Sequence, residues 1–260
     1  TDGKAKSIIR GIPKLEDALW AKERDAEKRS ACTLILTEGD SAASSAISGL
    51  TIVGREKWGV FPLRGKLPNV RDITLKKFND NAELASLKRI LGLEQGKIYK
   101  SIRDLRYGRI MIMADQDHDG SHIKGLVMNL FHTEWPELLK AGFVCSLMTP
   151  LLKAMKLTGG SGGKEVIPFY SISAFDRWKE SLGTPGTPSH GSTRGWSIKY
   201  YKGLGTSTAT ESREWFKKLH EIHYRWDDKT DDSMNLAFHK KKADERKTWL
   251  ATYDNKCEVV

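Results

Sequence analysis

The fold of this chain is constrained most strongly by its short apolar segments. Each ends at glycine or at charged residues, and helical patterns lie between them. Each segment has the length and apolar content of a buried strand. These segments are 33–37 (TLILT), 59–63 (GVFPL) and 109–114 (RIMIMA), with a fourth candidate at 143–148. Helical spacing of apolar residues marks 41–50, 81–93 and 121–140. Because strands alternate with helices, we predict an α/β fold with a parallel sheet flanked by helices.

The composition is that of a folded protein with a basic surface. The 260 residues are 39% hydrophobic and 29% charged, and the formal net charge is +10, which suits a polyanionic partner. No apolar run approaches the roughly 20 residues that span a bilayer, so we expect no membrane partner. Cys32, Cys145 and Cys257 are widely separated and lack C-x-x-C spacing. This pattern predicts neither a disulfide framework nor a zinc site, and it favours a reducing compartment.

Acidic residues follow two of the predicted strands at the point where each strand ends. Glu38 ends the first strand, and Gly39 after it permits a tight turn. Asp115, Asp117 and Asp119 follow the third strand at alternate positions, so an extended turn lets them converge. In open α/β sheets, ligands bind outside the carboxyl ends of the strands. Crowded carboxylates repel one another unless a cation compensates, and a few hard oxygen ligands favour Mg²⁺.

A calcium-binding EF-hand is the sharpest alternative for the segment that starts at Asp115. Gly120 occupies position six as that motif requires, but position twelve is Leu126, which cannot ligate. The preceding segment also has the pattern of a strand rather than of an amphipathic helix. His118 and His122 have the spacing of a zinc pair, but no third nitrogen or sulfur ligand is near in the sequence. A solvated acidic turn remains as the alternative to a metal site.

The acidic motifs resemble those of a known family. E-G-D at 38–40 and D-x-D-x-D-G at 115–120 look like the two acidic motifs of a TOPRIM domain, which topoisomerases, bacterial primases and some nucleases share. The surrounding sequence resembles the eukaryotic-type type IIA DNA topoisomerases over most of the chain. The segments that carry this second resemblance are 61–71 (FPLRGKLPNVR), 106–122 (RYGRIMIMADQDHDGSH), 169–172 (FYSI), 199–207 (KYYKGLGTS) and 237–250, which contains HKKKADERKTWL.

The resemblance implies a TOPRIM, Rossmann-like parallel sheet with a C-terminal helical extension. It divides the chain into a linker at 1–30, a TOPRIM domain at 31–201 and a helical extension at 202–260. Two segments without periodicity, near 158–168 and 183–195, would be loop insertions in that domain, and the first contains TGGSGG.

The same resemblance assigns roles to individual residues. Glu38, Asp115 and Asp117 would bind Mg²⁺, with two ions per site, and Asp119 would support them as a fourth catalytic acid. Contacts to double-stranded DNA would come from polar and basic residues near the cut or at the junction with the next domain. These residues are Arg64, Lys66, Asn69, Arg71, Lys199, Lys202, Lys240 and Lys241. Pro68 departs from the family, which carries an aliphatic residue there.

The implied reaction is that of an ATP-dependent topoisomerase, which passes one duplex through a transient double-strand break in another. In the family a tyrosine forms the covalent link to DNA, and none of the 7 tyrosines here lies in its Arg-Tyr winged-helix context. We therefore expect the attacking tyrosine and the ATP-binding domain to lie outside this chain, which alone should not relax supercoils. The full enzyme would be a homodimer in the nucleus, or in a cytoplasmic factory if a virus encodes it.

Two other classes of function remain open at this point. A free-standing TOPRIM nuclease or primase-like enzyme would hydrolyse DNA or make primers without a tyrosine, although the segment 199–207 argues against it. A non-catalytic DNA-binding module would keep its function in the full protein when Glu38 or Asp115 is replaced by alanine.

Overall fold

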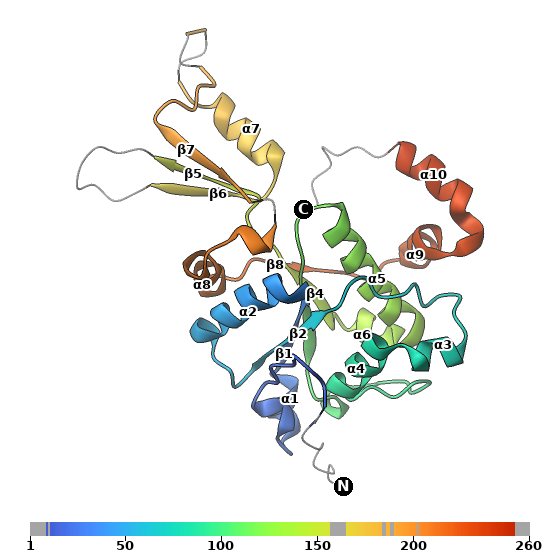
Figure 1. Cartoon of the computed structure of the whole chain (residues 1–260). Helices are drawn as coiled ribbons and strands as arrows, with labels where there is room; N and C mark the ends of the chain where they lie inside the picture. The colour runs from blue at the N-terminus through green and yellow to red at the C-terminus, as the bar shows by residue number, and fades with distance from the viewer. Residues whose placement is uncertain are drawn as a thin grey trace.

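The central feature of the fold is a five-stranded sheet with the strand order β2-β1-β3-β4-β8 (Figure 1). The computed structural model describes residue 9 and residues 11–156, 165–183, 186–187, 190–201 and 203–252. The strands of the main sheet are β1 (Thr33–Glu38), β2 (Trp58–Leu63), β3 (Arg109–Met113), β4 (Val144–Leu147) and β8 (Glu221–His223). Strands β1 to β4 pair in parallel, and β8 pairs antiparallel with β4. The predicted α/β fold with a parallel sheet is therefore confirmed.

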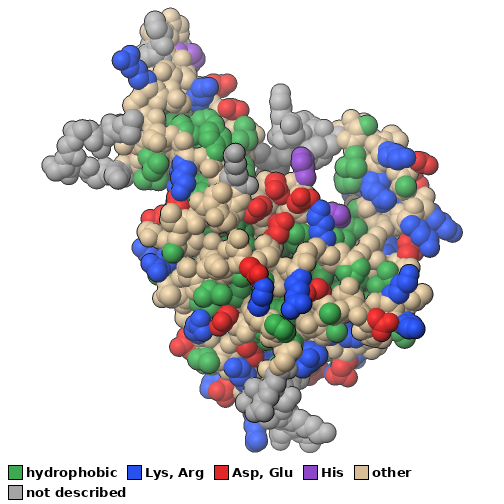
Figure 2. All heavy atoms as spheres, in the orientation of Figure 1, with side chains coloured by type: hydrophobic (Ala, Val, Ile, Leu, Met, Phe, Trp, Pro, Cys, Tyr) green, Lys and Arg blue, Asp and Glu red, His purple; other side chains and the backbone are tan. Residues whose placement is uncertain are grey.

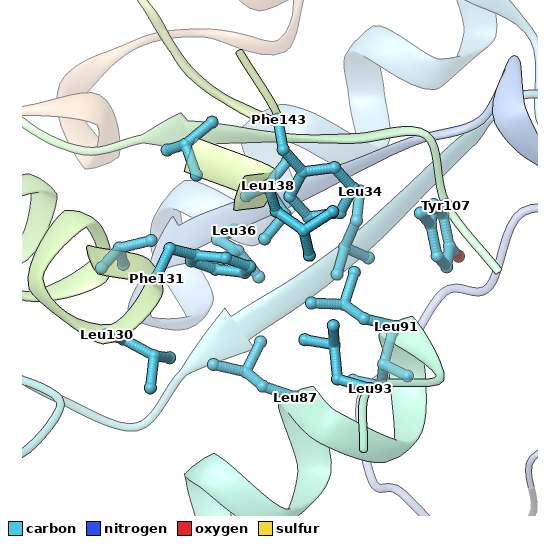
Figure 3. Close-up of a cluster of buried hydrophobic side chains, with 14 of the residues drawn as sticks. Leu34, Leu36, Leu87, Leu91, Leu93, Tyr107, Leu130, Phe131, Leu138 and Phe143 are labelled. Carbon is cyan, nitrogen blue, oxygen red and sulfur yellow. The ribbon is translucent and has the colours of Figure 1, made fainter. Parts of the chain in front are cut away.

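Helices cover both faces of this sheet because apolar side chains alternate along its central strands. In β1, Leu34 and Leu36 pack on one side and Ile35 on the other, and β3 repeats this alternation. The helices that supply the two layers are α4 (Ala82–Leu91), α5 (His118–Glu134) and α6 (Pro136–Lys140) on the first side, and α2 (Gly39–Val53) and α8 (Ala209–Lys217) on the second. Figure 3 shows the core on the first side, where Leu87 and Phe131 join the leucines of β1.

A proline divides the helical segment that was predicted at 121–140. Helix α5 ends at Glu134, Trp135 leaves the helical conformation, and α6 begins at Pro136. Proline has no N–H to donate and disfavours helical geometry in the residue before it. The helix also starts earlier than predicted, because the side chain of Asp117 caps it.

A second, antiparallel sheet extends the fold, and the sequence patterns did not predict it. It consists of β5 (Leu152–Lys156), β6 (Val166–Phe169) and β7 (Trp196–Tyr200) in the order β6-β5-β7, with α7 (Ile172–Glu180) beside it. The buried residues Leu152, Ala154, Phe169 and Phe175 form a small core of its own. The TGGSGG segment lies outside the described residues, as do parts of 183–195.

The chain returns from the second sheet to the main one through α8. The elements that follow are β8, α9 (Thr230–Phe238), η4 (Lys240–Lys242) and α10 (Ala243–Ala251). The segment predicted as a helical extension therefore contains helices, and its strand β8 completes the main sheet. The domain boundaries at 31 and 202 stay a prediction.

The segment before β1, predicted as a linker, contacts the main sheet. Glu16 forms backbone hydrogen bonds with Val60 of β2, and Ala18 and Ala21 are fully buried. The remaining short elements are η1 (Trp20–Lys22), α1 (Ala26–Ser30), α3 (Leu75–Asp80), η2 (Ile102–Asp104) and η3 (Leu204–Thr206). Within the described ranges, no helix has the length and apolar content needed to cross a bilayer.

Candidate functional site

The ends of β1 and β3 bring the predicted acidic residues to one edge of the main sheet. The two strands are adjacent and parallel, and Thr37 of β1 pairs with Met113 of β3. Glu38 therefore ends its strand at the level where the chain leaves β3 toward Asp115. Gly39 has a φ of +75°, which side chains rarely adopt, and it turns the chain from Glu38 into α2. Figure 2 shows acidic side chains gathered near the middle of one face, with basic side chains and histidines beside them.

Glu38 occupies a partly desolvated position among the other acids. Its Oε2 atom is buried and has no hydrogen-bond partner among the residues that the structure describes. Burial raises the pKa of Glu38, and the charges of Asp115, Asp117 and Asp119 raise it further, while a hydrogen bond from the Asp115 backbone lowers it in part. The four carboxylates therefore repel one another across a shared site.

The backbone of the chain already holds two of the aspartates. Asp115 Oδ1 accepts a hydrogen bond of 2.7 Å from the N–H of Leu204, a residue far away in the sequence. Asp117 Oδ1 accepts a hydrogen bond of 2.8 Å from the N–H of Gly120 and so caps α5. In both cases the bonded oxygen is Oδ1.

Asp119 differs from the other acids because it is exposed and paired with a lysine. Lys66 Nζ lies 2.5 Å from Asp119 Oδ1, and the side chains of Lys66 and Asp119 are 42% and 67% exposed. The hydrogen bond from Lys66 lowers the pKa of Asp119. The structure thus brings the predicted DNA-binding lysine directly to the acidic site.

A buried lysine lies beneath the acids, and the sequence patterns did not single it out. Lys124 on α5 is 9% exposed, and its Nζ donates a hydrogen bond of 3.3 Å to Gln116 Oε1. Burial lowers the pKa of Lys124, whereas the charges of Asp117, Glu38 and Asp115 raise it. This ammonium group offsets part of the negative charge at the ends of the strands.

The geometry excludes an EF-hand and leaves the zinc pair without support. Leu126, at position twelve of the would-be calcium loop, is buried in the core, and a strand precedes the loop. His118 and His122 lie exposed in the first turns of α5. Among the described residues, no three or more His, Cys, Asp or Glu side chains are arranged to ligate one metal ion.

The donor chemistry of the acidic site fits Mg²⁺, although the carboxylates would have to move together to ligate it. Glu38 Oε2 is a buried oxygen without a partner, and oxygen is the donor that Mg²⁺ takes. Asp115 and Asp117 add charge close enough to raise the pKa of Glu38. The assignment of Glu38, Asp115 and Asp117 as metal ligands stays a prediction.

Two of the predicted DNA contacts, Asn69 and Arg71, are engaged in hydrogen bonds within the chain. Asn69 Nδ2 donates to the carbonyl of Phe238 at 2.6 Å, and Asn69 Oδ1 accepts from Asn129 Nδ2 at 2.9 Å. Arg71 donates from Nε to Asn129 Oδ1 at 3.2 Å and from its guanidinium to Asn235 Oδ1 at 2.5 Å. These bonds tie the loop after β2 to α5 and α9, so both side chains hold the fold together here.

The remaining predicted DNA contacts lie in different settings. Arg64 has a side chain that is 63% exposed, and Lys240 and Lys241 are exposed in η4. Lys199 is part-buried and forms two hydrogen bonds with a glutamate of α8. Lys202 lies outside the described residues. The structure therefore places Arg64 and the η4 lysines at the surface. Arg64 Nε lies 3.8 Å from Glu83 Oε1, and Lys199 also has an acidic partner.

The Arg-Tyr pair at positions 106 and 107 has a structural role. Tyr107 is fully buried, its hydroxyl donates to Asp17 Oδ1 at 2.5 Å, and it accepts from the N–H of Ala18 at 2.9 Å. Arg106 forms a buried ion pair with the same aspartate. Both residues lie before β3, at the opposite end of that strand from Asp115. An attacking tyrosine outside this chain stays a prediction.

Two family models match the chain in succession. The Toprim domain matches residues 33–148, and the C-terminal associated domain of TOPRIM matches residues 147–259. DNA topoisomerase 2 of Pisum sativum is 49% identical over 258 residues, which are 98% of this chain and 17% of that protein. DNA topoisomerase 2-beta of Homo sapiens is 48% identical over 253 residues, which are 95% of this chain and 14% of that protein. The chain thus spans less than a fifth of the length of either relative.

A solved structure shares this fold over nearly the whole chain. The crystal structure of the DNA-binding, cleavage and re-ligation domain of Plasmodium falciparum topoisomerase II aligns with a TM-score of 0.85 and 45% sequence identity. The alignment covers 98% of this chain and 33% of that one.

Proposed function

The chain belongs to the DNA topoisomerase 2 family, and we propose that it supplies the Mg²⁺-binding acidic site of a DNA cleavage and rejoining core. The observation that carries the proposal is the meeting of Glu38 with Asp115 and Asp117 at the carboxyl ends of two adjacent parallel strands. One Glu38 oxygen there is buried without a partner among the described residues, and the carboxylates carry more negative charge than the buried Lys124 offsets. A divalent cation relieves that repulsion.

The proposed metal ligands are Glu38, Asp115 and Asp117, with Asp119 beside them, for two ions per site. When bound, Mg²⁺ supplies charge stabilisation to the oxygen that leaves the cut phosphodiester and later returns to it. The Glu38 carboxyl group would also act as a general acid or base at that oxygen. The raised pKa of Glu38 supports this role, because it brings the protonated form closer to neutral pH.

Basic side chains around the acids would bind the DNA backbone. Lys66 can exchange the Asp119 carboxylate for a DNA phosphate, since both groups reach solvent. Arg64, Lys240 and Lys241 are exposed and can add phosphate contacts. Such contacts would hold the register of the duplex without reading its sequence.

The activity of the whole protein follows as a further proposal, because this chain spans only part of its relatives. The full enzyme would pass one DNA duplex through a double-strand break in another, as an ATP-dependent homodimer in the nucleus. The attacking tyrosine and the ATP site would lie in other parts of that protein. A virus-encoded enzyme would instead work in a cytoplasmic factory.

Titration of the purified chain with Mn²⁺, with Mg²⁺ as competitor, tests the proposed metal site. Glu38→Gln should abolish or strongly weaken binding, because it removes a charged ligand oxygen. Asp40→Asn is the matched control, since Asp40 lies two residues away, is exposed and pairs with Lys14. Equal Mn²⁺ affinity in Glu38→Gln and the unaltered chain would refute the proposal, as would an unaltered chain that binds no divalent ion.

A further inference from the structure

A glutamate on α8 joins both ends of the loop that reaches the acidic site. Glu211 accepts two hydrogen bonds from Lys199 Nζ, at 2.7 and 2.9 Å, and one of 2.5 Å from the hydroxyl of Tyr201. At the other end of the loop, the N–H of Thr208 donates to Glu211 Oε2 at 2.8 Å. One carboxylate therefore bonds residues on both sides of Leu204.

The middle of this loop lies against the carboxylate of Asp115. The N–H of Leu204 donates to Asp115 Oδ1 at 2.7 Å. A Cβ added at Gly203 would lie 2.3 Å from Asp115 Oδ2, so the loop touches both carboxylate oxygens. Leu204 is itself 3% exposed and packs in the same core as α2 and α8.

We propose that Glu211 is a positioning residue for the acidic site, because it fixes the loop whose backbone N–H orients Asp115. The consequence for metal affinity rests on the function proposed above, whereas the placement of the Leu204 N–H does not. The two sides of the loop are held differently. The side after Leu204 rests on α2, where Ser45 Oγ donates to the Leu204 carbonyl at 3.4 Å. The side before Gly203 is the one that Glu211 secures, through Lys199 and Tyr201.

The surroundings of Glu211 favour a carboxylate that keeps its hydrogen-bond partners rather than one that exchanges them. Its side chain is 17% exposed. Burial alone would raise the pKa of Glu211, but the hydrogen bonds from Lys199, Thr208 and Tyr201 lower it to about 2. The carboxylate is therefore charged and bonded across the neutral range.

This arrangement also connects the second sheet to the acidic site. Lys199 belongs to β7 of that sheet, and the N–H of Tyr201 donates to the carbonyl of Leu151, just before β5. A shift of β7 relative to α8 would stretch the bonds to Glu211 and move the Leu204 N–H. Glu211 therefore lies between β7 of the second sheet and the loop that contacts Asp115.

Amide hydrogen exchange of the ¹⁵N-labelled chain tests the proposal without any metal. Glu211→Gln weakens the charged bonds to Lys199 and Tyr201, yet glutamine at this position still completes the capping box with Thr208. Because these charge-assisted bonds fix the loop, their loss should make exchange of the Leu204 N–H roughly tenfold faster, which corresponds to about 1.4 kcal/mol. Tyr201→Phe, which removes a single hydroxyl, should give a smaller change in the same direction.

Glu214→Gln is the matched control, because Glu214 lies on the same helix and pairs with Lys153 of the second sheet. It should leave exchange of the Leu204 N–H within about twofold of the unaltered chain. Exchange of the α8 amides shows whether that helix persists in both variants. Unchanged exchange in Glu211→Gln, or equal acceleration in Glu214→Gln, would overturn the proposal.

Mn²⁺ titration of the same variants separates this inference from the proposed function. Weaker Mn²⁺ binding in Glu211→Gln but not in Glu214→Gln supports a positioning role. Unchanged Mn²⁺ binding in Glu211→Gln, together with faster exchange of the Leu204 N–H, overturns it. If the unaltered chain binds no Mn²⁺, the proposed metal site fails, and the exchange data alone decide whether Glu211 fixes the loop.

Discussion

Replacing Gly203 with alanine should displace the carboxylate of Asp115 without straining the backbone. A Cβ at this position would lie 2.3 Å from Asp115 Oδ2, well inside van der Waals contact. The backbone tolerates a side chain, because the φ of Gly203 is 176°, an extended value that any residue adopts. The carboxylate must therefore rotate away, and its 2.7 Å hydrogen bond from the Leu204 N–H is lost.

The lost hydrogen bond sets the size of the effect. A hydrogen bond to a charged group contributes about 1.5–3 kcal/mol, so Gly203→Ala should lower the free energy of unfolding by about 2 kcal/mol. The same displacement should weaken Mn²⁺ binding by roughly tenfold or more, because about 1.4 kcal/mol of lost binding energy is a tenfold change in affinity.

Gly205→Ala provides the matched control for this measurement. A Cβ at Gly205 would meet Ser41 Cβ at 3.3 Å and would approach no acid. Urea unfolding followed by circular dichroism gives the free energy of unfolding, and calorimetric titration gives the Mn²⁺ affinity. If Gly203→Ala and Gly205→Ala unfold at the same urea concentration and bind Mn²⁺ equally well, the reasoning about Asp115 is wrong.

Three further predictions concern the acids and the basic residues around them. Glu38→Gln should stabilise the metal-free chain near neutral pH. The pKa of Glu38 in the folded chain lies above the usual 4.5, so the unaltered chain loses stability as the pH rises from about 4.5 through that folded pKa. Urea midpoints should converge below that window, and a variant less stable than the unaltered chain at neutral pH would contradict this. Arg71→Met should lower the free energy of unfolding by about 1–3 kcal/mol, because it removes the donor to Asn129 and Asn235, and unchanged proteolysis of α9 would argue against it. Lys66→Ala should weaken duplex DNA binding and reduce the slope of log affinity against log salt by about one, whereas an unchanged slope would exclude a phosphate contact.

Buried parallel strands were the most predictable part of this fold. Such strands read as unbroken apolar runs, and the predicted bounds of β1, β2 and β3 agree with the structure to within one residue at each end. The location of Glu38 and Asp115 followed from the same strands, because an acid directly after a buried strand lies at its carboxyl end. The part of the site that lies directly at the strand ends was therefore predictable from the sequence.

The second sheet was not predictable because its pairing is not local. Strand β5 pairs with β6 and β7, and β7 begins about forty residues after β5 in the chain. Its strands are short, and β6 contains Pro168, which lowers the strand signal. The Gly- and Ser-rich segments between these strands indicate loops but do not indicate which strands they connect.

Two contributors to the acidic site lacked a clear signal in the sequence. Lys124 lies on an amphipathic helix, where a lysine ordinarily faces solvent, yet it is buried here. The Leu204 N–H is a backbone donor, which any residue type can supply. For Asn69 and Arg71 the sequence signal was present but indicated another role. Polar residues in a basic loop suggest DNA contacts, whereas both side chains form hydrogen bonds to α5 or α9.

Anomalous diffraction from crystals of this chain soaked in Mn²⁺ would locate the proposed metal site. We expect an anomalous peak within coordination distance of Glu38 and Asp115 or Asp117, with the carboxylates drawn together around it. The peak should disappear in Glu38→Gln and persist in Asp40→Asn. A map without a peak at the ends of β1 and β3, or with Mn²⁺ bound only elsewhere, would show that these acids do not form a metal site.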